Sequence, residues 1–547
     1  MKVVIVGGVA GGATAAARLR RLDEQAEIVI LERGGYISFA NCGLPYYIGG
    51  SIKERDELLL QTPESFHARF NVDVRVNQEA VAIDREAKTV TVCDLLVGQE
   101  YLEPYDKLIL APGAKPNIPD LPGMRSERLF TLRNIADTDA IKEFVRQQHP
   151  QHATIIGGGY IGVEMADNLL DAGLAVSIVQ RSGHVIKTLD ADIAAQVHAH
   201  IYAKGVKLYL NTPFDGVQQQ PDGRLKVLLG NKDQLTDMVI LAIGVTPDTR
   251  IAQEAGLVCD AKGGIIVNEK MLTSDPDVYA VGDAVVVKDL IGGQPALIPL
   301  AGPANKQGRV AADNIAGIDS VYRGTQGSSV LKVFDLTVAS TGLNEKQAQA
   351  AGIAYGKVYL NPASHAAYYP GGSPISLKVL FSPADGRILG AQGVGSEGVD
   401  KRIDVLAVAI RAQMTAHDLT ELELCYAPPY SSAKDPVNMV GYVIENLMAG
   451  RVRQFFWDEV DDLPRDGSVQ LIDVRLPLEY ARDSLEGFVN IPVDNLRARL
   501  SELDPAKPVY LVCQSAIRSY IAARILSQHG FADVLHLAGG YRLYSSI

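Results

Sequence analysis

Cysteine is scarce in this chain: its 547 residues include only Cys42, Cys93, Cys259, Cys425 and Cys513. The number is odd and the spacing matches neither a disulfide framework nor a zinc site, so we expect reduced thiols and no bound metal. Cys42 has no CxxC or CxxxxC partner, and a lone cysteine cannot store two electrons as an internal disulfide. Redox chemistry at Cys42 therefore requires a partner sulfur from outside the chain, or oxidation of the single sulfur.

The chain also lacks a net positive charge and long apolar runs. The formal net charge is −12, which disfavours nucleic acids and anionic membranes as partners. No stretch approaches the ~20 apolar residues of a transmembrane helix, and residues 2–6 have the pattern of a buried strand rather than of a signal peptide. We therefore expect a cytoplasmic protein, and at ~150 residues per domain the length predicts three or four domains.

The beginning of the chain follows the pattern of a dinucleotide-binding βαβ unit. We expect strands at 3–6 and 27–31, a helix at 13–22, and before the helix a turn made of Gly7, Gly8, Val9, Ala10, Gly11 and Gly12. Such a turn lets a pyrophosphate approach the helix N-terminus, and an acid ~20 residues further on, here Glu32, can bind a ribose hydroxyl. Val9 stands where the middle glycine of the fingerprint is usual.

A second unit carries the full G-x-G-x-x-G pattern. It consists of Gly157, Gly158, Gly159, Tyr160, Ile161 and Gly162, after an expected strand at 153–156. The next strand, 175–179, ends at Gln180 and Arg181. An acid there would favour NADH, whereas Gln180 cannot repel a 2′-phosphate and Arg181 could attract one. The sequence leaves NADH and NADPH open.

Two dinucleotide units in one chain suggest two nucleotides that exchange electrons. Residues 273–283, which end in Gly282 and Asp283, resemble the flavoprotein segment whose aspartate binds the flavin ribityl chain. With Cys42 between the two turns, the order resembles the pyridine nucleotide-disulfide oxidoreductase superfamily over residues 1 to ~450. The resemblance implies a homodimer and an α/β fold with an FAD-binding domain (1–112 and 248–320), an NAD(P)-binding domain (113–247) and an α+β dimerisation domain (321–450).

The rest of the chain restarts an α/β alternation after a charge-rich segment, 451–467, which we expect to be a linker. Cys513 lies between an expected strand at 509–512 and a helix, where backbone N–H groups converge. The run from Cys513 to Arg518 resembles the persulfide loop of rhodanese domains, so residues 468–547 are expected to form a rhodanese-like α/β domain. The usual fourth loop residue is glycine, and Ala516 there is expected to narrow the loop or to demand a negative φ.

The motif around Cys42, Ser-Phe-Ala-Asn-Cys-Gly, resembles the single-cysteine branch of the superfamily: coenzyme A-disulfide reductases, NADH oxidases and NADH peroxidases. The oxidases and peroxidases carry a histidine where this chain has Ala10, and without that proton donor peroxide cleavage loses ~10²–10⁴-fold. With its rhodanese-like part, the chain resembles coenzyme A-disulfide reductase–rhodanese fusions, also described as NADH-dependent persulfide or polysulfide reductases.

The resemblance assigns residues to each ligand. FAD and NAD(P)H would contact the two glycine turns and Glu32, Arg33, Asn41, Val81, Ala111, Gly113, Arg133, Gln180, Arg181, Gly244, Gly282, Asp283 and Ala301. Coenzyme A would contact Thr14, Arg18, Arg21, Ser38, Asn41, Cys42, Asn305 and Lys434. Thr14, Arg18 and Arg21 are spaced i, i+4 and i+7 and so share one helix face, where the two arginines can clamp the anionic end of coenzyme A.

Catalysis would depend on Cys42, Cys513, Tyr426, Tyr368 and Arg518. Tyr426 would reach across the dimer to the other subunit's Cys42, as proton donor or thiolate stabiliser, supported by Tyr368 or its neighbour Tyr369. Cys42 is expected to attack as a thiolate, with its pKa depressed by the flavin site. Cys513 would take up sulfane sulfur as a persulfide and donate it to coenzyme A, whose phosphopantetheine arm would carry it to Cys42 for release as hydrogen sulfide.

Several alternatives stay open at this point. The substrate can be coenzyme A disulfide, coenzyme A persulfide or a polysulfide, and Cys513 can serve its own chain or its partner. An NADH oxidase or peroxidase is a rival, against which Ala10 and the rhodanese-like part argue. A redox-sensing or sulfur-carrier protein with slow flavin turnover is another. Cys93 and Cys259 are expected to be buried structural thiols, and Cys425 has no assigned role.

Overall fold

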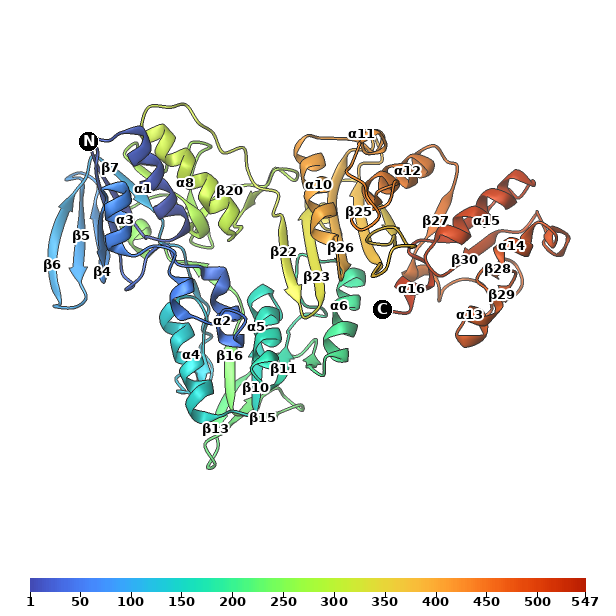
Figure 1. The fold of residues 1–547 in the computed structure, drawn as a ribbon, viewed down its shortest axis with the longest axis horizontal. Coiled ribbons are helices and arrows are strands. Elements are labelled where there is room, and N and C mark those ends of the chain that lie inside the picture. The colour runs from blue at the N-terminus through green and yellow to red at the C-terminus, as the bar shows by residue number, and fades with distance from the viewer. The chain divides into compact units, whose positions relative to one another are not determined.

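A computed structural model describes all 547 residues of the chain, which form two compact units. Unit 1 comprises residues 1–185 and 205–327, and unit 2 comprises residues 186–204 and 328–547. Figure 1 labels their helices and strands. The segment 186–204 falls within the stretch that the sequence assigns to the NAD(P)-binding domain, and it clusters with unit 2.

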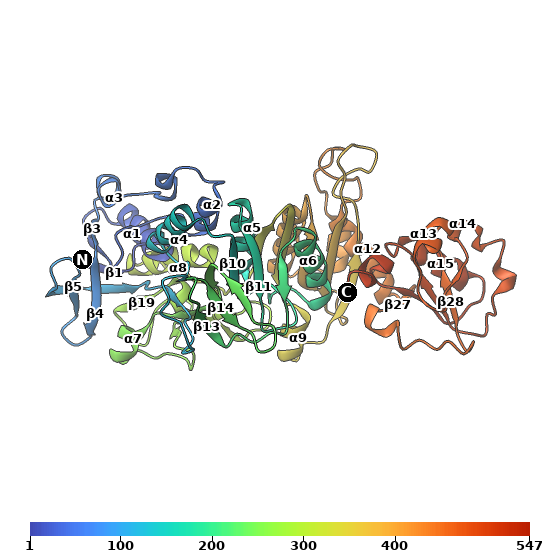
Figure 2. The same cartoon turned by 90° about the horizontal axis from the view of Figure 1, so that it is seen from below.

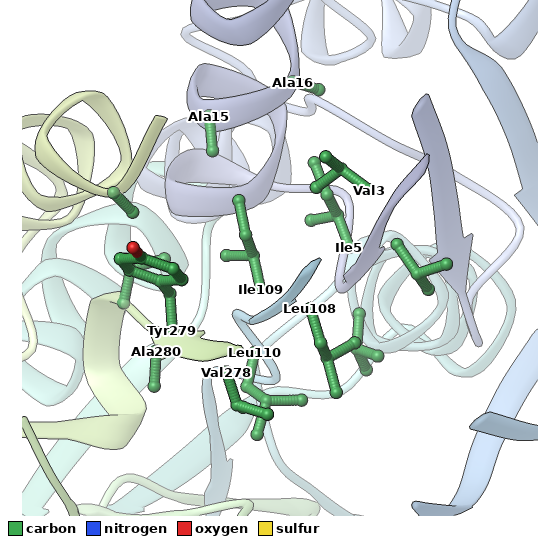
Figure 3. Close-up of a cluster of buried hydrophobic side chains, with 14 of the residues drawn as sticks. Val3, Ile5, Ala15, Ala16, Leu108, Ile109, Leu110, Val278, Tyr279 and Ala280 are labelled. Carbon is green, nitrogen blue, oxygen red and sulfur yellow. The ribbon is translucent and has the colours of Figure 1, made fainter. Parts of the chain in front are cut away.

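The first sheet of unit 1 is parallel, as expected for a dinucleotide-binding fold. Its order is β19–β7–β1–β2–β3, with strands β1 (Lys2–Val6), β2 (Glu27–Glu32), β3 (Asp73–Val76), β7 (Lys107–Leu110) and β19 (Val278–Ala280). Figure 3 shows Ala15 of helix α1 (Ala10–Leu22) above Ile109 of this sheet, in a core where each buried aliphatic side chain contributes ~1.5–3 kcal/mol. Helix α1 begins inside the glycine turn rather than after it, because the Val9 carbonyl accepts a hydrogen bond from the Ala13 N–H.

Helix α8 (Ala301–Ile315) lies close against α1. A Cβ on Gly308 would stand 2.4 Å from the carbonyl oxygen of Gly11, so this approach requires glycine at position 308. Polar side chains of the two helices are brought into contact as a result, and they belong to the candidate coenzyme A site described below.

A second parallel sheet repeats the pattern in unit 1. Its order is β12–β11–β10–β16–β9, with strands β9 (Leu129–Phe130), β10 (His152–Ile156), β11 (Ala175–Val179), β12 (Lys207–Tyr209) and β16 (Met238–Leu241). Helix α5 (Tyr160–Asp171) follows β10 through the second glycine turn. Helix α2 (Leu44–Gly49) packs on α5 so closely that a Cβ on Gly49 would lie 2.4 Å from the Asn168 side-chain oxygen. The α2–α5 contact brings the Cys42 segment to the helix of the second glycine turn.

Smaller elements complete unit 1. The helices are α3 (Pro63–Phe70), α4 (Ile135–Gln148) and α7 (Arg250–Glu254). The strands are β4 (Gln78–Asp84), β5 (Thr89–Asp94), β6 (Gln99–Pro104), β8 (Ala114–Pro116), β13 (Gly216–Gln219), β14 (Leu225–Leu228), β15 (Gln234–Thr236), β17 (Val245–Pro247), β18 (Ile265–Ile266), β20 (Val285–Lys288) and β21 (Pro295–Ala296).

Unit 2 contains an antiparallel sheet within the stretch expected to be the dimerisation domain. Its order is β22–β23–β26–β25–β24, with strands β22 (Ser329–Val333), β23 (Leu336–Gly342), β24 (Gly356–Leu360), β25 (Ile375–Phe381) and β26 (Ile388–Gly395). Strands β25 and β26 form a hairpin, and Gly386 in its turn has φ +74°. The accompanying helices are α6 (Ala191–Ala203), α9 (Glu345–Ala350), α10 (Val399–Arg411), α11 (Ala416–Glu421) and α12 (Pro436–Met448).

A buried lysine fastens segment 186–204 to this sheet. Lys378 on β25 is 1% exposed, and its ammonium contacts Asp190 at 2.9 Å, Asp192 at 2.8 Å and also Glu345. Burial by itself lowers the pKa of Lys378, but the three carboxylates raise it above its usual value, so the group stays charged. The Tyr359 hydroxyl donates a further hydrogen bond to Asp192.

The last sheet of unit 2 is parallel, in the order β27–β31–β30–β28–β29. Its strands are β27 (Arg453–Phe455), β28 (Gln470–Asp473), β29 (Val489–Asn490), β30 (Val509–Val512) and β31 (Val534–Leu537), and its helices are α13 (Pro477–Arg482), α14 (Val493–Leu496), α15 (Ile517–Gln528) and α16 (Gly540–Tyr544). Figure 2 labels β27 and β28 of this sheet, together with helices α13, α14 and α15. Strand β27 lies in the charge-rich segment 451–467. This segment joins the sheet because Phe455 is buried with Leu537 and Tyr541.

The fold class is the predicted one, α/β with two Rossmann-like sheets, an α+β domain and a further parallel α/β domain. None of the helices is both long enough and apolar enough to cross a bilayer.

Candidate active site

Cys42 lies in a single 3₁₀ turn, Asn41–Gly43, directly before helix α2. The residue is exposed. Ser38, four residues earlier, has a positive φ of 46° and donates its backbone N–H to the Gly8 carbonyl at 2.9 Å. The structure thus brings the Cys42 segment against the first glycine turn, as the predicted roles of Ser38 and Asn41 require.

The charges around Cys42 oppose its ionisation. Although Cys42 is exposed, partial desolvation of its thiol, then the charges of Glu164 and Asp283, raise the pKa of Cys42, and only Arg133 lowers it. Arg133 is itself paired with Asp283 at 2.8 Å. The groups that this chain supplies therefore raise the Cys42 pKa, and the depression expected from the flavin site stays a prediction.

Sequence reasoning missed the pair formed by Tyr46 and Glu164. The Tyr46 hydroxyl donates to a Glu164 carboxylate oxygen at 3.3 Å, across the contact between α2 and α5. Burial raises the pKa of Glu164 to about 7 and that of Tyr46 to about 12. The sequence holds only a faint signal, because Tyr46 follows Cys42 by one helical turn and Glu164 follows Gly162, but their contact is between distant segments.

The first turn fits the pyrophosphate and ribose of FAD. Gly7 has φ +99°, and a Cβ there would lie 2.2 Å from the Ala111 carbonyl oxygen. A Cβ on Gly12 would lie 1.9 Å from the Gly7 oxygen, so the turn leaves backbone rather than side chains facing a ligand. Glu32 ends β2 and accepts hydrogen bonds from the N–H groups of Gly8 at 2.8 Å and Gly34 at 2.7 Å.

The second turn fits a nicotinamide dinucleotide in the same way. Gly157 has φ +107°, and a Cβ on Gly162 would lie 1.9 Å from the Gly157 oxygen. Gln180 takes the place of Glu32, since its side-chain oxygen accepts the Gly158 N–H at 2.9 Å. Its amide donates to the Ser182 hydroxyl at 2.6 Å. Arg181 is exposed and forms no hydrogen bond or ion pair, which leaves its charge available to a ligand.

The other predicted cofactor residues belong to other elements of unit 1. Val81 sits at the bulge of β4, and Ala301 begins α8. Arg33 forms an ion pair with Asp248 at 2.8 Å. Gly113 has φ +71°, Gly244 has φ +108°, and Gly282 begins the turn that contains Asp283.

The predicted coenzyme A residues of α1 are partly engaged by α8. The Thr14 hydroxyl donates to the Asn305 side-chain oxygen at 2.9 Å, and Arg18 forms an ion pair with Asp313 at 2.7 Å. Arg21 is exposed and forms no ion pair. Of the two arginines expected to clamp an anion, one therefore already has a carboxylate partner. Lys434, in unit 2, is exposed and forms no ion pair.

Of the two neighbouring tyrosines, Tyr368 is the one that contacts Tyr426. The hydroxyl groups of Tyr368 and Tyr426 lie 2.9 Å apart, whereas Tyr369 packs edge-on against His365. Tyr368 is 75% exposed and Tyr426 is 48% exposed, which is unusual for large aromatic side chains. The two form one exposed pair, as surfaces that receive a partner or a ligand often do.

A buried arginine, also missed from sequence, holds the two tyrosine segments together. The same Arg402 nitrogen donates to the Ser364 carbonyl, the Ser431 hydroxyl and the Asp435 carboxylate, each at 3.0 Å. Ser364 precedes Tyr368 and Ser431 follows Tyr426, so this arginine fixes the distance between the two loops. The sequence offers one indication of this role: Arg402 is a charged residue on the buried face of α10.

Cys513 follows β30 and is completely buried, at 0% exposure. Its carbonyl accepts the Tyr541 N–H at 2.8 Å, and the Gln514 carbonyl accepts the Arg542 N–H at 3.0 Å. Arg518 lies in the first turn of α15, and both of its terminal nitrogens bind Glu479, at 2.6 and 2.8 Å. The predicted pair of Cys513 and Arg518 thus lies in the connection from β30 into α15. The charge of Arg518 is already balanced by the Glu479 carboxylate.

Ala516 adopts φ +70°, in the left-handed region. The expectation that its methyl demands a negative φ is wrong, because the surrounding loop keeps the conformation that glycine would adopt. This conformation is strained by ~1–2 kcal/mol for an L-residue. Cys93 and Cys259 are half-buried rather than fully buried, and Cys425 is exposed.

Known protein families match three successive parts of the chain. A family model described as pyridine nucleotide-disulphide oxidoreductase matches residues 1–308, the model of its dimerisation domain matches residues 328–436, and a rhodanese-like domain model matches residues 456–546. The chain is 39% identical to a Staphylococcus aureus (strain JH9) coenzyme A disulfide reductase over 442 residues, 81% of this chain and 99% of that protein.

Two solved structures extend over the whole chain. Reduced CoADR-RHD from Bacillus anthracis is 50% identical with a TM-score of 0.96, over 100% of this chain and 98% of that one. An NAD-dependent persulfide reductase from A. fulgidus is 37% identical with a TM-score of 0.93, over 100% of both chains.

Proposed function

Because this chain belongs to the pyridine nucleotide-disulfide oxidoreductase family and carries a rhodanese-like domain, we propose that it is an FAD-dependent reductase of coenzyme A persulfide and disulfide. NAD(P)H is the proposed electron source. The observation that carries the proposal is the presence of two sulfur sites in one chain: exposed Cys42 against the first glycine turn, and buried Cys513 in the loop after β30. The NADH oxidase or peroxidase alternative has less support, because Ala10 offers no proton donor for peroxide.

The chain's own groups then have the following roles. Bound FAD supplies hydride acceptance from NAD(P)H and two-electron reduction of a disulfide. The Cys42 thiolate attacks one sulfur of the substrate disulfide, forming a Cys42–sulfur bond while the substrate's S–S bond breaks and a thiolate leaves. Arg133 favours the Cys42 thiolate against the opposing charges of Glu164 and Asp283.

We assign Tyr426, with Tyr368 hydrogen-bonded to it, to protonation of the leaving thiolate. The matched dimerisation domain supports a homodimer, and we propose that this exposed pair completes the site of the other subunit. In the rhodanese-like domain, Cys513 takes sulfane sulfur from a donor persulfide: a Cys513–sulfur bond forms, the donor S–S bond breaks, and the donor thiolate departs.

Anaerobic turnover tests the function and the sulfur relay together. The NADH-reduced enzyme should be reoxidised rapidly by coenzyme A persulfide with stoichiometric sulfide release. A Cys513→Ser variant should keep full activity on preformed coenzyme A persulfide, and lose at least about 10²-fold of the rate that depends on a separate sulfane donor. Flavin absorbance measures the reoxidation of the enzyme, and a sulfide assay measures the sulfide that is released.

A Cys259→Ser variant is the matched control and should retain both activities. If both activities survive Cys513→Ser, the relay is wrong. If the wild type retains bound FAD but does not turn over, the reductase assignment itself is wrong.

Gln180 and Arg181 provide a prediction about the nicotinamide. A Gln180→Glu variant should lose about 10–100-fold of kcat/KM for NADPH relative to NADH, because a carboxylate at this position repels a 2′-phosphate. Glu32 accepts the equivalent backbone N–H in the first turn, so the substitution fits the local geometry. Arg181→Ala should lower kcat/KM for NADPH and leave kcat/KM for NADH unchanged. Steady-state kinetics with both nucleotides measure this, and an unchanged ratio in both variants would contradict the assignment.

A further inference from the structure

The edge strand of the antiparallel sheet in unit 2 reaches the rhodanese-like domain. Asn361, directly after β24, donates its side-chain N–H to the Gly539 carbonyl at 3.0 Å. The other end of the same amide is fixed, because its oxygen accepts the Ser376 hydroxyl of β25 at 2.9 Å. Asn361 is thus oriented by its own sheet and directed at a single peptide of the neighbouring domain.

Gly539 belongs to the turn that shapes the loop of Cys513. Both Gly539 and Gly540 have positive φ, +76° and +69°. A Cβ on Gly540 would lie 2.6 Å from the Cys513 carbonyl oxygen and 2.8 Å from the Ala516 nitrogen, so the turn touches both ends of the loop. The next residue, Tyr541, donates its N–H to the Cys513 carbonyl.

The contact between the two domains is also closely packed at this point. Tyr359 of β24 is buried with Ala538 and Leu543, which flank the glycine turn, and with Phe456. Strand β24 and the residue after it therefore make two contacts with the turn and its flanks: the apolar contact of Tyr359 and the hydrogen bond of Asn361.

We propose that Asn361 is a positioning residue for Cys513: by holding the Gly539 carbonyl, it fixes the glycine turn against which the persulfide loop is formed. The sulfurtransfer loop is then built by two domains, and strand β24 is part of its support. The inference rests on the proposed role of Cys513 as a sulfane carrier.

The strained loop explains why outside support has an effect. Ala516 holds a left-handed conformation that is unfavourable for alanine. Gly540 can approach the Ala516 nitrogen only while the turn stays in place. A loosened turn lets the loop relax, which opens the buried Cys513 thiol and disperses the N–H groups that surround a persulfide.

Two readouts on the full-length protein test the proposal. In Asn361→Ala, the rate of Cys513 persulfide formation from glutathione persulfide should fall about fivefold to tenfold, as expected for the loss of one hydrogen bond in the loop's support. Alkylation of Cys513 by iodoacetamide should instead become about fivefold faster, since the thiol becomes accessible. Mass spectrometry of the Cys513 peptide measures both. Ser376→Ala, which leaves the amide present but free to turn, should show smaller changes in the same directions.

A matched control removes a different hydrogen bond between the same domains. The Asn446 side chain donates to the Tyr520 hydroxyl at 3.3 Å. Asn446→Ala should leave both rates unchanged, and coenzyme A disulfide reduction should stay at wild-type level in all three variants. If Asn446→Ala matches Asn361→Ala, the effect is general domain docking and the proposal is wrong.

Asn361→Asp covers the case in which the alanine variant folds poorly, because its carboxylate keeps the shape but repels the Gly539 carbonyl. It should be at least as impaired as Asn361→Ala. Unchanged alkylation in both variants would overturn the proposal. A wild type that forms no persulfide at Cys513 would instead contradict the proposed carrier function, while the alkylation rates still decide whether Asn361 positions the loop.

Discussion

A Cys42→Ser variant is expected to lose at least about 10³-fold of kcat in the reduction of coenzyme A disulfide and persulfide. A serine hydroxyl is neither ionised at neutral pH nor able to form a disulfide, so the covalent step has no substitute. No other cysteine stands within the same 3₁₀ turn or the helix that follows it. Steady-state consumption of NAD(P)H with each substrate measures the loss.

The half-reaction separates this role from a structural one. Bleaching of the flavin by NAD(P)H should persist in Cys42→Ser, since neither FAD nor NAD(P)H needs Cys42 in order to bind at its glycine turn. Cys93→Ser, which replaces a half-buried thiol of β5, should keep wild-type kcat. Disulfide reduction by Cys42→Ser at more than a tenth of the wild-type rate would refute the assignment of Cys42 as the nucleophile.

The second large effect is on stability. Replacing Lys378 with methionine should lower the free energy of unfolding of unit 2 by about 3–5 kcal/mol, because the carboxylates of Asp190, Asp192 and Glu345 would lose their buried cation. Urea denaturation followed by tyrosine and tryptophan fluorescence measures it. Lys357→Met is the control: Lys357 pairs with Glu345 alone, at 3.1 Å and nearer the surface, and should cost at most about 1 kcal/mol.

The pH dependence of this loss has a defined sign. Burial alone raises the pKa of Glu345, but Lys378 and Lys357 bring it below its usual value. In the wild type, the ionised Glu345 carboxylate adds to the free energy of unfolding at pH values above the pKa of ~4.3 that a glutamate has in the unfolded chain. This contribution is lost as the pH falls through the lower pKa that Glu345 has in the folded protein. In Lys378→Met the carboxyls can protonate at higher pH, so the gap between variant and wild type should shrink below about pH 5. A gap that grows on acidification would contradict the buried-cation explanation.

Local patterns predicted the elements that carry the nucleotide turns. Glycine spacing and short apolar runs located β1, β2, β10 and β11 to within one residue, because these signals depend only on neighbouring positions. The same locality explains the predicted placement of Cys513 between a strand and a helix.

Contacts between distant segments were beyond these patterns. The helical spacing of Thr14, Arg18 and Arg21 correctly placed them on one face, but it could not show that Asp313 already binds Arg18. Likewise, the preference of an isolated alanine predicts a negative φ for Ala516, whereas in the folded loop, close to Gly540, it has φ +70°. Charged residues such as Arg402 and Lys378 suggest surface positions, and their burial depends on partners far along the chain.

Strand β27 has a consequence for where the C-terminal domain can be separated from the rest. It pairs with β31, whose residues are all buried, and so it closes one edge of the parallel sheet. A gene cut at the sequence-predicted boundary of residue 468 would remove β27 and leave β31 as an apolar, unpaired edge, a template for self-association. Soluble expression of the isolated domain therefore calls for a start before Arg453, so that the chain brings its own protection against aggregation.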